Sequence, residues 1–239
     1  MSKKELNQND KFKHDLIDTF EPNFTFSDKP ISRFKMSSSN NAKNILDKAE
    51  KLLKLKQDIN SIENCNLKNN SKNLILGDGN VNSPIMLIGE APGAEEDISC
   101  LAFQGENGKL LKKMLIAINI KIEKIYLSYA VNFRPPEDRK PTAQEIKRYS
   151  LFLKEHVSII NPKIIILMGS TAMESMTGIK NKISDERGNW KEIIIKNKTY
   201  SMMITFSPSY LNRFPENKRH AWEDLKKIKL KIEDLNIKI

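Results

Sequence analysis

Four short apolar runs, separated by amphipathic segments, constrain the fold of this chain more than any other feature. The runs are Ile85-Met86-Leu87-Ile88, Ile125-Tyr126-Leu127, Ile164-Ile165-Ile166-Leu167-Met168 and Met202-Met203-Ile204-Thr205. Segments with helical periodicity lie at about 108–118, 142–160, 170–177 and 217–232. Continuous apolar runs of strand length are typical of strands buried on both faces, and their alternation with helices indicates a parallel sheet. We therefore predict an α/β fold, a three-layer α/β/α sandwich around a four-stranded parallel sheet. Residues 193–200 add a hairpin at one edge.

The N-terminal part of the chain has a different character. Residues 1–41 are polar, lack periodicity and end in Ser37-Ser38-Ser39-Asn40-Asn41, which predicts a mostly disordered tail. A helical pattern follows in Ile45, Ala49, Leu52, Leu53 and Leu55. No internal repeat is visible, so we expect one folded domain over residues 42–239.

Several protein classes are excluded by composition. No run of 18 apolar residues exists, and the N-terminus lacks the apolar core of a signal peptide. The chain has two cysteines and three histidines, with neither a C-x-x-C nor an H-E-x-x-H motif, which argues against a disulfide scaffold and a zinc site. We expect a soluble, cytoplasmic, monomeric protein without a membrane partner.

The chain is basic, with 40 Lys and Arg against 30 Asp and Glu, a net charge of +10 and a pI of about 9.4. A surplus of this size is typical of proteins that bind a phosphate backbone. The chain is also rich in Lys, Asn and Ile, which an AT-rich coding sequence supplies by mutational bias alone. Charge therefore indicates nucleic acid only together with a motif.

Unusual loops follow three of the predicted strands. They are Gly89–Asp97, Asn132–Pro141 and Ser207–Arg213, all rich in Gly, Pro or charged residues. In an open parallel sheet, ligands bind beyond the carboxyl ends of the strands. Each loop alone could be an ordinary turn, but their coincidence at one edge predicts a functional site there.

Motifs in these loops carry a resemblance that covers residues 62–229. They are G-E-A-P-G at 89–93 with E-E-D at 95–97, F-Q-G at 103–105, R-P-P at 134–136, R-G at 187–188, and P-S-Y-L at 208–211 with Arg213. This part of the chain resembles the family-4 type uracil-DNA glycosylases, and the first and last motifs are the most specific. The resemblance implies an α/β/α fold and an enzyme that flips a damaged base out of DNA and hydrolyses its N-glycosidic bond.

The resemblance also assigns roles to individual residues. The catalytic positions are Glu90 and Glu96, which position the attacking water, and Ser207. The base-binding positions are Ala91, Phe103 and Tyr129, where the Phe103 ring stacks on the flipped base. The DNA-binding positions are Arg134, Arg139, Ser209, Tyr210, Leu211 and Arg213, which grip phosphates and wedge the gap left by the base. Plain core packing is the alternative for Phe103, and a surface ion pair is the alternative for Arg134.

Two departures from the family pattern affect its chemistry. The four cysteines that hold the family's iron–sulfur cluster are replaced here by Ile62, Cys65, Phe133 and Tyr149, so we predict no cluster and no other metal. Cys65 is then most simply a small buried residue. Tyr129 stands where the family has a base-reading Asn, and Ser207 where it has a His. Loss of one preorganised donor costs about 10²–10³ in rate.

Three hypotheses remain open at this point. The chain is a DNA glycosylase for uracil or another deaminated base, a catalytically weak or silent DNA-binding descendant, or an unrelated small-molecule α/β enzyme. Retention of Glu90, Glu96 and Phe103 favours the first over the second, and the three loops argue against the third.

Overall fold

The computed structural model describes residues 37–238, with side chains from residue 45 onward. The chain divides into residues 1–40 and 41–239, and of the first unit only the start of helix α2 (Ser37–Asn60) is described. The predicted disordered tail falls mainly on residues 1–36, which lie outside the described residues. Residues 37–41, also assigned to that tail, belong to α2, so the helix begins before the predicted boundary.

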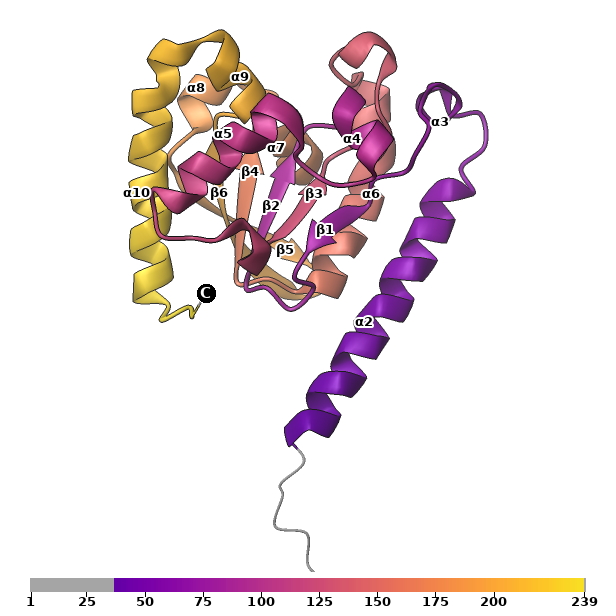
Figure 1. Ribbon diagram of the computed structural model, residues 1–239, viewed down its shortest axis with the longest axis horizontal. Helices are drawn as coiled ribbons and strands as arrows, with labels where there is room; N and C mark the ends of the chain where they lie inside the picture. Colours follow the sequence, from indigo (N-terminus) through magenta and orange to yellow (C-terminus); the bar gives the residue numbers. More distant parts are fainter. Residues whose placement is uncertain (1–36, 239) are drawn as a thin grey trace, which may run out of the picture. The chain divides into compact units, whose positions relative to one another are not determined.

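A single mixed sheet forms the centre of the domain (Figure 1). Its strands are β1 (Gly77–Gly79), β2 (Ile85–Gly89), β3 (Tyr126–Tyr129), β4 (Ile164–Met168), β5 (Trp190–Ile195) and β6 (Lys198–Thr205), in the order β1-β3-β2-β4-β6-β5. The pairs β3–β2, β2–β4 and β4–β6 are parallel, whereas β1 and β5 pair antiparallel at the two edges. The sheet is therefore six-stranded and mixed. The predicted sheet of four strands lacked β1, and the predicted edge hairpin is confirmed as β5–β6.

Helices connect the strands. They are α3 (Asn66–Asn70), α4 (Ala94–Ser99), α5 (Gly105–Ile116), α6 (Ala143–Ile160), α7 (Ser170–Thr177), α8 (Ile183–Glu186), α9 (Pro208–Arg213) and α10 (Lys218–Asp234). Short 3₁₀ turns lie at η1 (Ile122–Lys124), η2 (Pro136–Asp138) and η3 (Pro215–Asn217). The four helical segments predicted after residue 100 correspond to α5, α6, α7 and α10.

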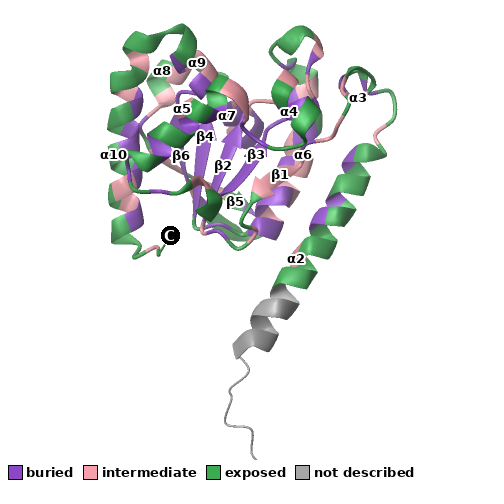
Figure 2. Cartoon of the chain, viewed as in Figure 1, coloured by how far each residue is buried: buried purple, intermediate pink, exposed green. Residues whose placement is uncertain are grey.

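The strand residues alternate between two hydrophobic clusters, one on each face of the sheet. Met86 and Ile88 of β2 join a cluster with side chains of α2, α6 and α7. Ile85 and Leu87 join a second cluster with side chains of α5, α9 and α10. Figure 2 shows the buried inner strands and the half-buried, half-exposed helices around them. The three-layer arrangement follows because successive strand side chains point to opposite faces.

In the described part of the chain, no helix combines the length and the apolar composition needed to cross a bilayer.

Candidate active site

The carboxyl ends of the parallel strands open onto a cavity of about 380 Å³. It is lined by side chains or backbone from all three predicted loops, including the predicted residues Glu90, Ala91, Glu96, Phe103, Tyr129, Arg139, Ser207 and Ser209. Tyr210 and Arg213 line a neighbouring hollow that also contains Glu90 and Ser207. The sequence therefore placed most of the candidate residues at one site.

Glu96 is held by backbone amides. It lies in the first turn of α4 and is buried. Its Oε2 accepts a hydrogen bond from Gly93 N (3.0 Å), and its Oε1 accepts one from Gln104 N (3.0 Å). The carboxylate thereby ties the first loop to the turn that carries Phe103. Glu96 acts through these contacts as a residue that positions the site.

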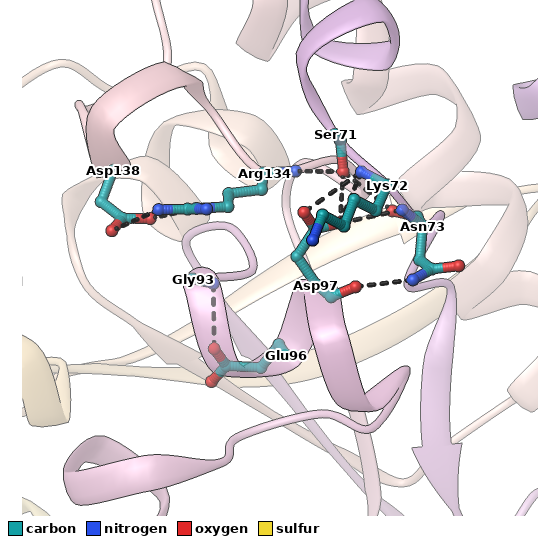
Figure 3. A network of polar contacts seen from close by, with 8 residues as sticks. All are labelled: Ser71, Lys72, Asn73, Gly93, Glu96, Asp97, Arg134 and Asp138. Carbon is teal, nitrogen blue, oxygen red and sulfur yellow. Dashed lines mark hydrogen bonds and ion pairs between the residues drawn. The ribbon is translucent and has the colours of Figure 1, made fainter.

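Asp97, the next carboxylate, has a similar role toward another segment (Figure 3). Its carboxylate accepts hydrogen bonds from Ser71 Oγ (2.7 Å), Lys72 N (2.9 Å) and Asn73 N (2.8 Å). Burial alone would raise the pKa of Asp97, but hydrogen bonds from Asn73, Ser71 and Lys72 outweigh it and lower the pKa. In the sequence, Asp97 is recognised only as part of the motif and receives no role. Its position directly after Glu96 is the signal that could have identified it.

Tyr129 and Phe103 form a stacked pair at the floor of the cavity. Their ring centroids are 4.9 Å apart with an interplanar angle of 21°. Tyr129 Oη accepts a hydrogen bond from Phe103 N (2.7 Å) and donates to Glu96 Oε1 (3.4 Å). Burial and the nearby Glu96 carboxylate raise the pKa of Tyr129, so the phenol stays protonated. The Tyr129 hydroxyl therefore already has one hydrogen-bond donor and one acceptor as partners. Phe103 packs in the core and also lines the cavity.

Gly89, the last residue of β2, permits this stacking. A Cβ at this position would lie 2.7 Å from Phe103 Cζ and 3.0 Å from Tyr129 Cδ1. Any side chain here would push both rings away from the sheet. Gly89 is thus a site residue that the sequence analysis read only as part of a motif.

Glu90 differs from Glu96 and Asp97. It lines both the cavity and the neighbouring hollow, and it is partly exposed. Glu90 Oε2 and Ser207 Oγ lie 3.8 and 3.6 Å from the point where a Cβ on Gly169 would stand. Gly169 has a φ of +97°, which favours glycine and lets the chain pass close beneath both side chains. The absent Cβ keeps this space open between β4 and the last loop.

Ser207 caps helix α9. Its Oγ accepts a hydrogen bond from Tyr210 N (3.2 Å) and lies 3.0 Å from Ser209 Oγ. A serine oxygen at this position satisfies a free amide of the first helical turn. The Tyr210 amide occupies one acceptor site of Ser207 Oγ. The Ser207 hydroxyl can therefore still donate its proton to Ser209 or to a ligand.

The predicted arginines differ in their partners. Arg134 Nε donates to Asp138 Oδ1 (2.7 Å), as Figure 3 shows, and Arg139 Nη2 donates to Glu145 Oε1 (2.7 Å). The alternative of a surface ion pair therefore describes Arg134 in this structure. Arg213 is exposed at the end of α9 and lines the hollow next to the cavity.

Leu211 packs in the core. It is 1% exposed and belongs to the cluster formed by α5, α9 and α10. The sequence analysis treated residues 207–213 as a loop, whereas Pro208–Arg213 forms a helix whose inner face carries Leu211. The DNA contact of Leu211 stays a prediction, and in this structure its side chain is covered.

The positions of the four family cysteines meet in one apolar cluster. Cys65, Phe133 and Tyr149 are buried there, and Ile62 is partly buried and packs against the same cluster. Cys65 Sγ lies 3.4 Å from Tyr149 Oη, and the rings of Phe133 and Tyr149 meet edge to face. One thiol with two aromatic rings and an isoleucine does not fit an iron–sulfur cluster, which is held by thiolates. Across the described residues, no group of three or more His, Cys, Asp or Glu side chains could hold a metal ion.

An α/β/α domain with a carboxylate, an aromatic pair and arginines at the carboxyl edge of its sheet matches the arrangement that the sequence motifs predict. The family model described as the uracil DNA glycosylase superfamily matches residues 76–226. The chain belongs to this superfamily.

Comparison with individual proteins gives the same result. The chain is 38% identical over 168 residues to the Type-4 uracil-DNA glycosylase of Thermotoga maritima, a match that covers 69% of this chain and 86% of that protein. It is 29% identical over 183 residues to the Type-4 uracil-DNA glycosylase of Archaeoglobus fulgidus, with coverages of 75% and 92%. A Type-5 uracil-DNA glycosylase of Pyrobaculum aerophilum is 25% identical over 116 residues, or 42% of this chain and 51% of that protein.

Proposed function

We propose that this protein is a DNA glycosylase of base-excision repair, which hydrolyses the N-glycosidic bond of uracil or another deaminated base flipped out of DNA. The observation that carries the proposal is the Glu90 carboxylate, which lines the same cavity as Phe103 and which, unlike the carboxylates of Glu96 and Asp97, accepts no hydrogen bond from the described residues. The superfamily membership and the Type-4 relatives support the same reaction.

In the proposed reaction, the flipped base enters the cavity over Phe103 and Glu90 orients a water molecule toward the sugar. The bond between the water oxygen and the anomeric carbon forms as the glycosidic bond breaks. Glu90 takes up a proton of the water, and the base departs as an anion that gains a proton from solvent. The Ser207 hydroxyl is the protein donor placed to stabilise a developing negative charge on the base.

The base preference depends on Tyr129. Its hydroxyl already accepts from Phe103 N and donates to Glu96, so it does not offer a base the donor and acceptor pair of an amide side chain. We propose that recognition of the base edge relies on the backbone and on Ser207. This observation also supports the second candidate, a weak or silent DNA-binding descendant.

An excision assay tests the proposal. Single-stranded and duplex oligonucleotides carrying uracil, hypoxanthine or xanthine are incubated with the protein and scored for alkali-labile breaks. Glu90→Gln keeps the shape of the side chain and removes its charge, so we expect excision to fall about 10²-fold or more with DNA binding nearly unchanged. Glu233→Gln, in the last turn of α10, exposed and outside the lining of the cavity, serves as the charge-matched control. Equal rates for Glu90→Gln and wild type would overturn the role of Glu90.

A second set of variants separates the two candidates. If the wild type excises no base, Ser207→His and Tyr129→Asn restore the family residues, and a gain on the order of 10² is expected from each recovered donor. If the double variant also excises nothing while still binding DNA, the silent DNA-binding descendant is the correct account.

We also propose that the iron–sulfur cluster of the family is lost in this chain. The support is that only one of the four positions carries a thiol, Cys65, and that the side chains at these positions pack together with α6. The side chains of Ile62, Phe133 and Tyr149 replace the cluster as the filling of this part of the core.

A further inference from the structure

The two aromatic side chains that line the cavity are both covered. Phe103 is 8% exposed and Tyr129 is 3% exposed, and their rings lie nearly parallel, 4.9 Å apart by centroids. A base that stacks on an aromatic side chain needs one free face of the ring. One face of Phe103 is covered by Tyr129, and the low exposure of both rings means that they meet the cavity with little more than their edges.

The backbone beneath the two rings leaves them no room to retreat. Both rings lie against Gly89 at the end of β2, where an added Cβ would stand 2.7 Å from Phe103 Cζ and 3.0 Å from Tyr129 Cε1. A base therefore cannot stack on Phe103 while the Tyr129 ring stays in this position. One of the two rings has to move first.

Hydrogen bonds hold the Tyr129 ring in place. Its Oη accepts from Phe103 N (2.7 Å) and donates to Glu96 Oε1 (3.4 Å). Phe103 has a φ of +52°, in the left-handed region that side chains rarely adopt, and the Tyr129 phenol binds its buried amide in this conformation. Departure of the ring would leave that amide without its partner, which costs free energy in a buried place. The stacked pair therefore resists displacement.

We infer that Tyr129 determines the specificity of this site because its ring takes the place of the base on Phe103. A nucleotide that carries a base binds fully only after the Tyr129 ring has left. A sugar and phosphate without a base can enter the cavity of about 380 Å³ while the ring stays. The affinity for a base is reduced by the cost of displacing the ring. This role rests on the proposed function, since it presupposes that a flipped nucleotide enters the cavity.

Tyr129 thus has two separable effects on the site. The asparagine of the family pattern at this position has no ring, so its replacement by Tyr129 both removes a base-reading amide and covers the stacking face of Phe103. Only an amide side chain restores the reading of the base edge. Any small side chain at position 129 uncovers Phe103, so an apolar variant distinguishes the covering ring from the missing amide.

A pair of oligonucleotides tests this role. One carries a 2′-fluorinated deoxyuridine, whose glycosidic bond resists hydrolysis, and the other carries a tetrahydrofuran abasic analogue at the same position. Fluorescence anisotropy gives the affinity of the protein for each. We expect the wild type to bind the uracil strand no more tightly than the abasic strand. We expect Tyr129→Ala to bind the uracil strand about tenfold more tightly than the abasic strand, because one base then stacks on Phe103.

Three further variants complete the comparison. Tyr200→Ala removes a tyrosine that is also 3% exposed but lies in the cluster on the other face of the sheet, outside the cavity lining, and it should behave like the wild type. Tyr129→Phe keeps the ring, so its preference should stay closer to that of the wild type than to that of Tyr129→Ala. Tyr129→Val, with a β-branched side chain that suits a strand, takes the place of Tyr129→Ala if the alanine variant does not fold.

This role of Tyr129 is overturned if the wild type already gains tenfold from the base, or if the small variants gain nothing. Equal preferences in Tyr129→Phe and Tyr129→Ala would also overturn it, since the ring would then not be the obstacle. These results leave the proposed reaction standing, because neither strand is hydrolysed in the assay. If every variant binds both strands no better than an undamaged strand, the proposed function fails, and the role of Tyr129 fails with it.

Discussion

Three of the four carboxylates between Glu90 and Asp97 have different tasks because their oxygens face different partners. Asp97 binds the segment before β1, Glu96 binds the turn before α5, and Glu90 faces the cavity. A sequence motif reports which residues are present but not which oxygens are occupied by backbone amides. The position of the site could be predicted from the sequence. The distinction between Glu90, which lines the cavity, and Glu96 and Asp97, which accept hydrogen bonds from backbone amides, required the folded backbone.

Tyr129→Phe tests the hydrogen bonds at the floor of the cavity. The change removes the acceptor of Phe103 N in a buried place, so we expect the free energy of unfolding to fall by about 1–3 kcal/mol. Chemical denaturation measures the difference. Tyr210→Phe, which removes a half-buried hydroxyl, is the control and should change stability by less. Equal stabilities of Tyr129→Phe and wild type would show that the Phe103 amide does not depend on this phenol.

Leu211→Ala distinguishes core packing from DNA contact. Because Leu211 is 1% exposed, we expect a loss of about 2–5 kcal/mol of stability. DNA affinity, measured well below the melting temperature, should stay close to that of the wild type. Leu230→Ala removes a leucine that is 59% exposed on α10, and it should shift stability by less than about 0.5 kcal/mol. A specific loss of DNA affinity in Leu211→Ala would support the predicted wedge role of this residue.

At the scale of the elements, the sequence was informative where burial alone decides the structure. Strands β2 and β4 and the second half of β6 are apolar runs, so their hydrophobicity identifies them without knowledge of their neighbours. Strand β1 is Gly77-Asp78-Gly79 and forms only because the backbone of β3 offers an antiparallel partner. Helix α9 was missed for a related reason, since its six residues gain their helical form from the Ser207 cap and the contact with α5.

Helix α6 carries a buried histidine that links it to β3. His156 Nε2 lies 2.9 Å from Tyr126 Oη, and Nδ1 lies 3.2 Å from Ser128 Oγ. Burial lowers the pKa of His156 to about 3. The ring is therefore neutral in the folded state, whereas it takes up a proton below about pH 6.5 in the unfolded chain. The stability contributed by the neutral ring is complete above that pH and is lost as the pH falls.

We expect the free energy of unfolding to decrease by about 1.4 kcal/mol per pH unit, through His156, between about pH 6 and pH 4. Chemical denaturation across this range measures the slope. His156→Gln keeps a polar side chain without a titrating ring, so its slope should be shallower by that amount. Parallel curves for wild type and variant would mean that His156 is protonated within the fold.

At the scale of the whole molecule, we propose that this family fold has kept its active-site edge while the part of the core at the family's cysteine positions has changed. The cavity lies at the carboxyl ends of the parallel strands, and the apolar cluster around Cys65 lies where α3 and the segment before Arg134 meet α6. On this proposal, the stability of that region comes from the many weak contacts of packed side chains and not from an inorganic group.

We therefore expect a colourless protein without bound iron. Elemental analysis should give far less than one iron atom per chain, and the absorbance spectrum should lack a shoulder in the visible range. A brown preparation with stoichiometric iron would contradict the loss of the cluster. Addition of a chelator should leave the melting temperature unchanged, since metal removal destabilises only proteins whose fold depends on the metal.

The two cysteines differ in burial, so their reactivity can measure local opening of the structure around Cys65. Cys100 is exposed at the end of α4, whereas Cys65 is 4% exposed and contacts Tyr149. A chromogenic disulfide reagent should consume one thiol at once and the second only as fast as the segment around α3 separates from α6. The slow phase would give the rate and free energy of that local opening under native conditions. The reactivity of Cys65 thus measures local opening at the place where we propose that the cluster has been lost.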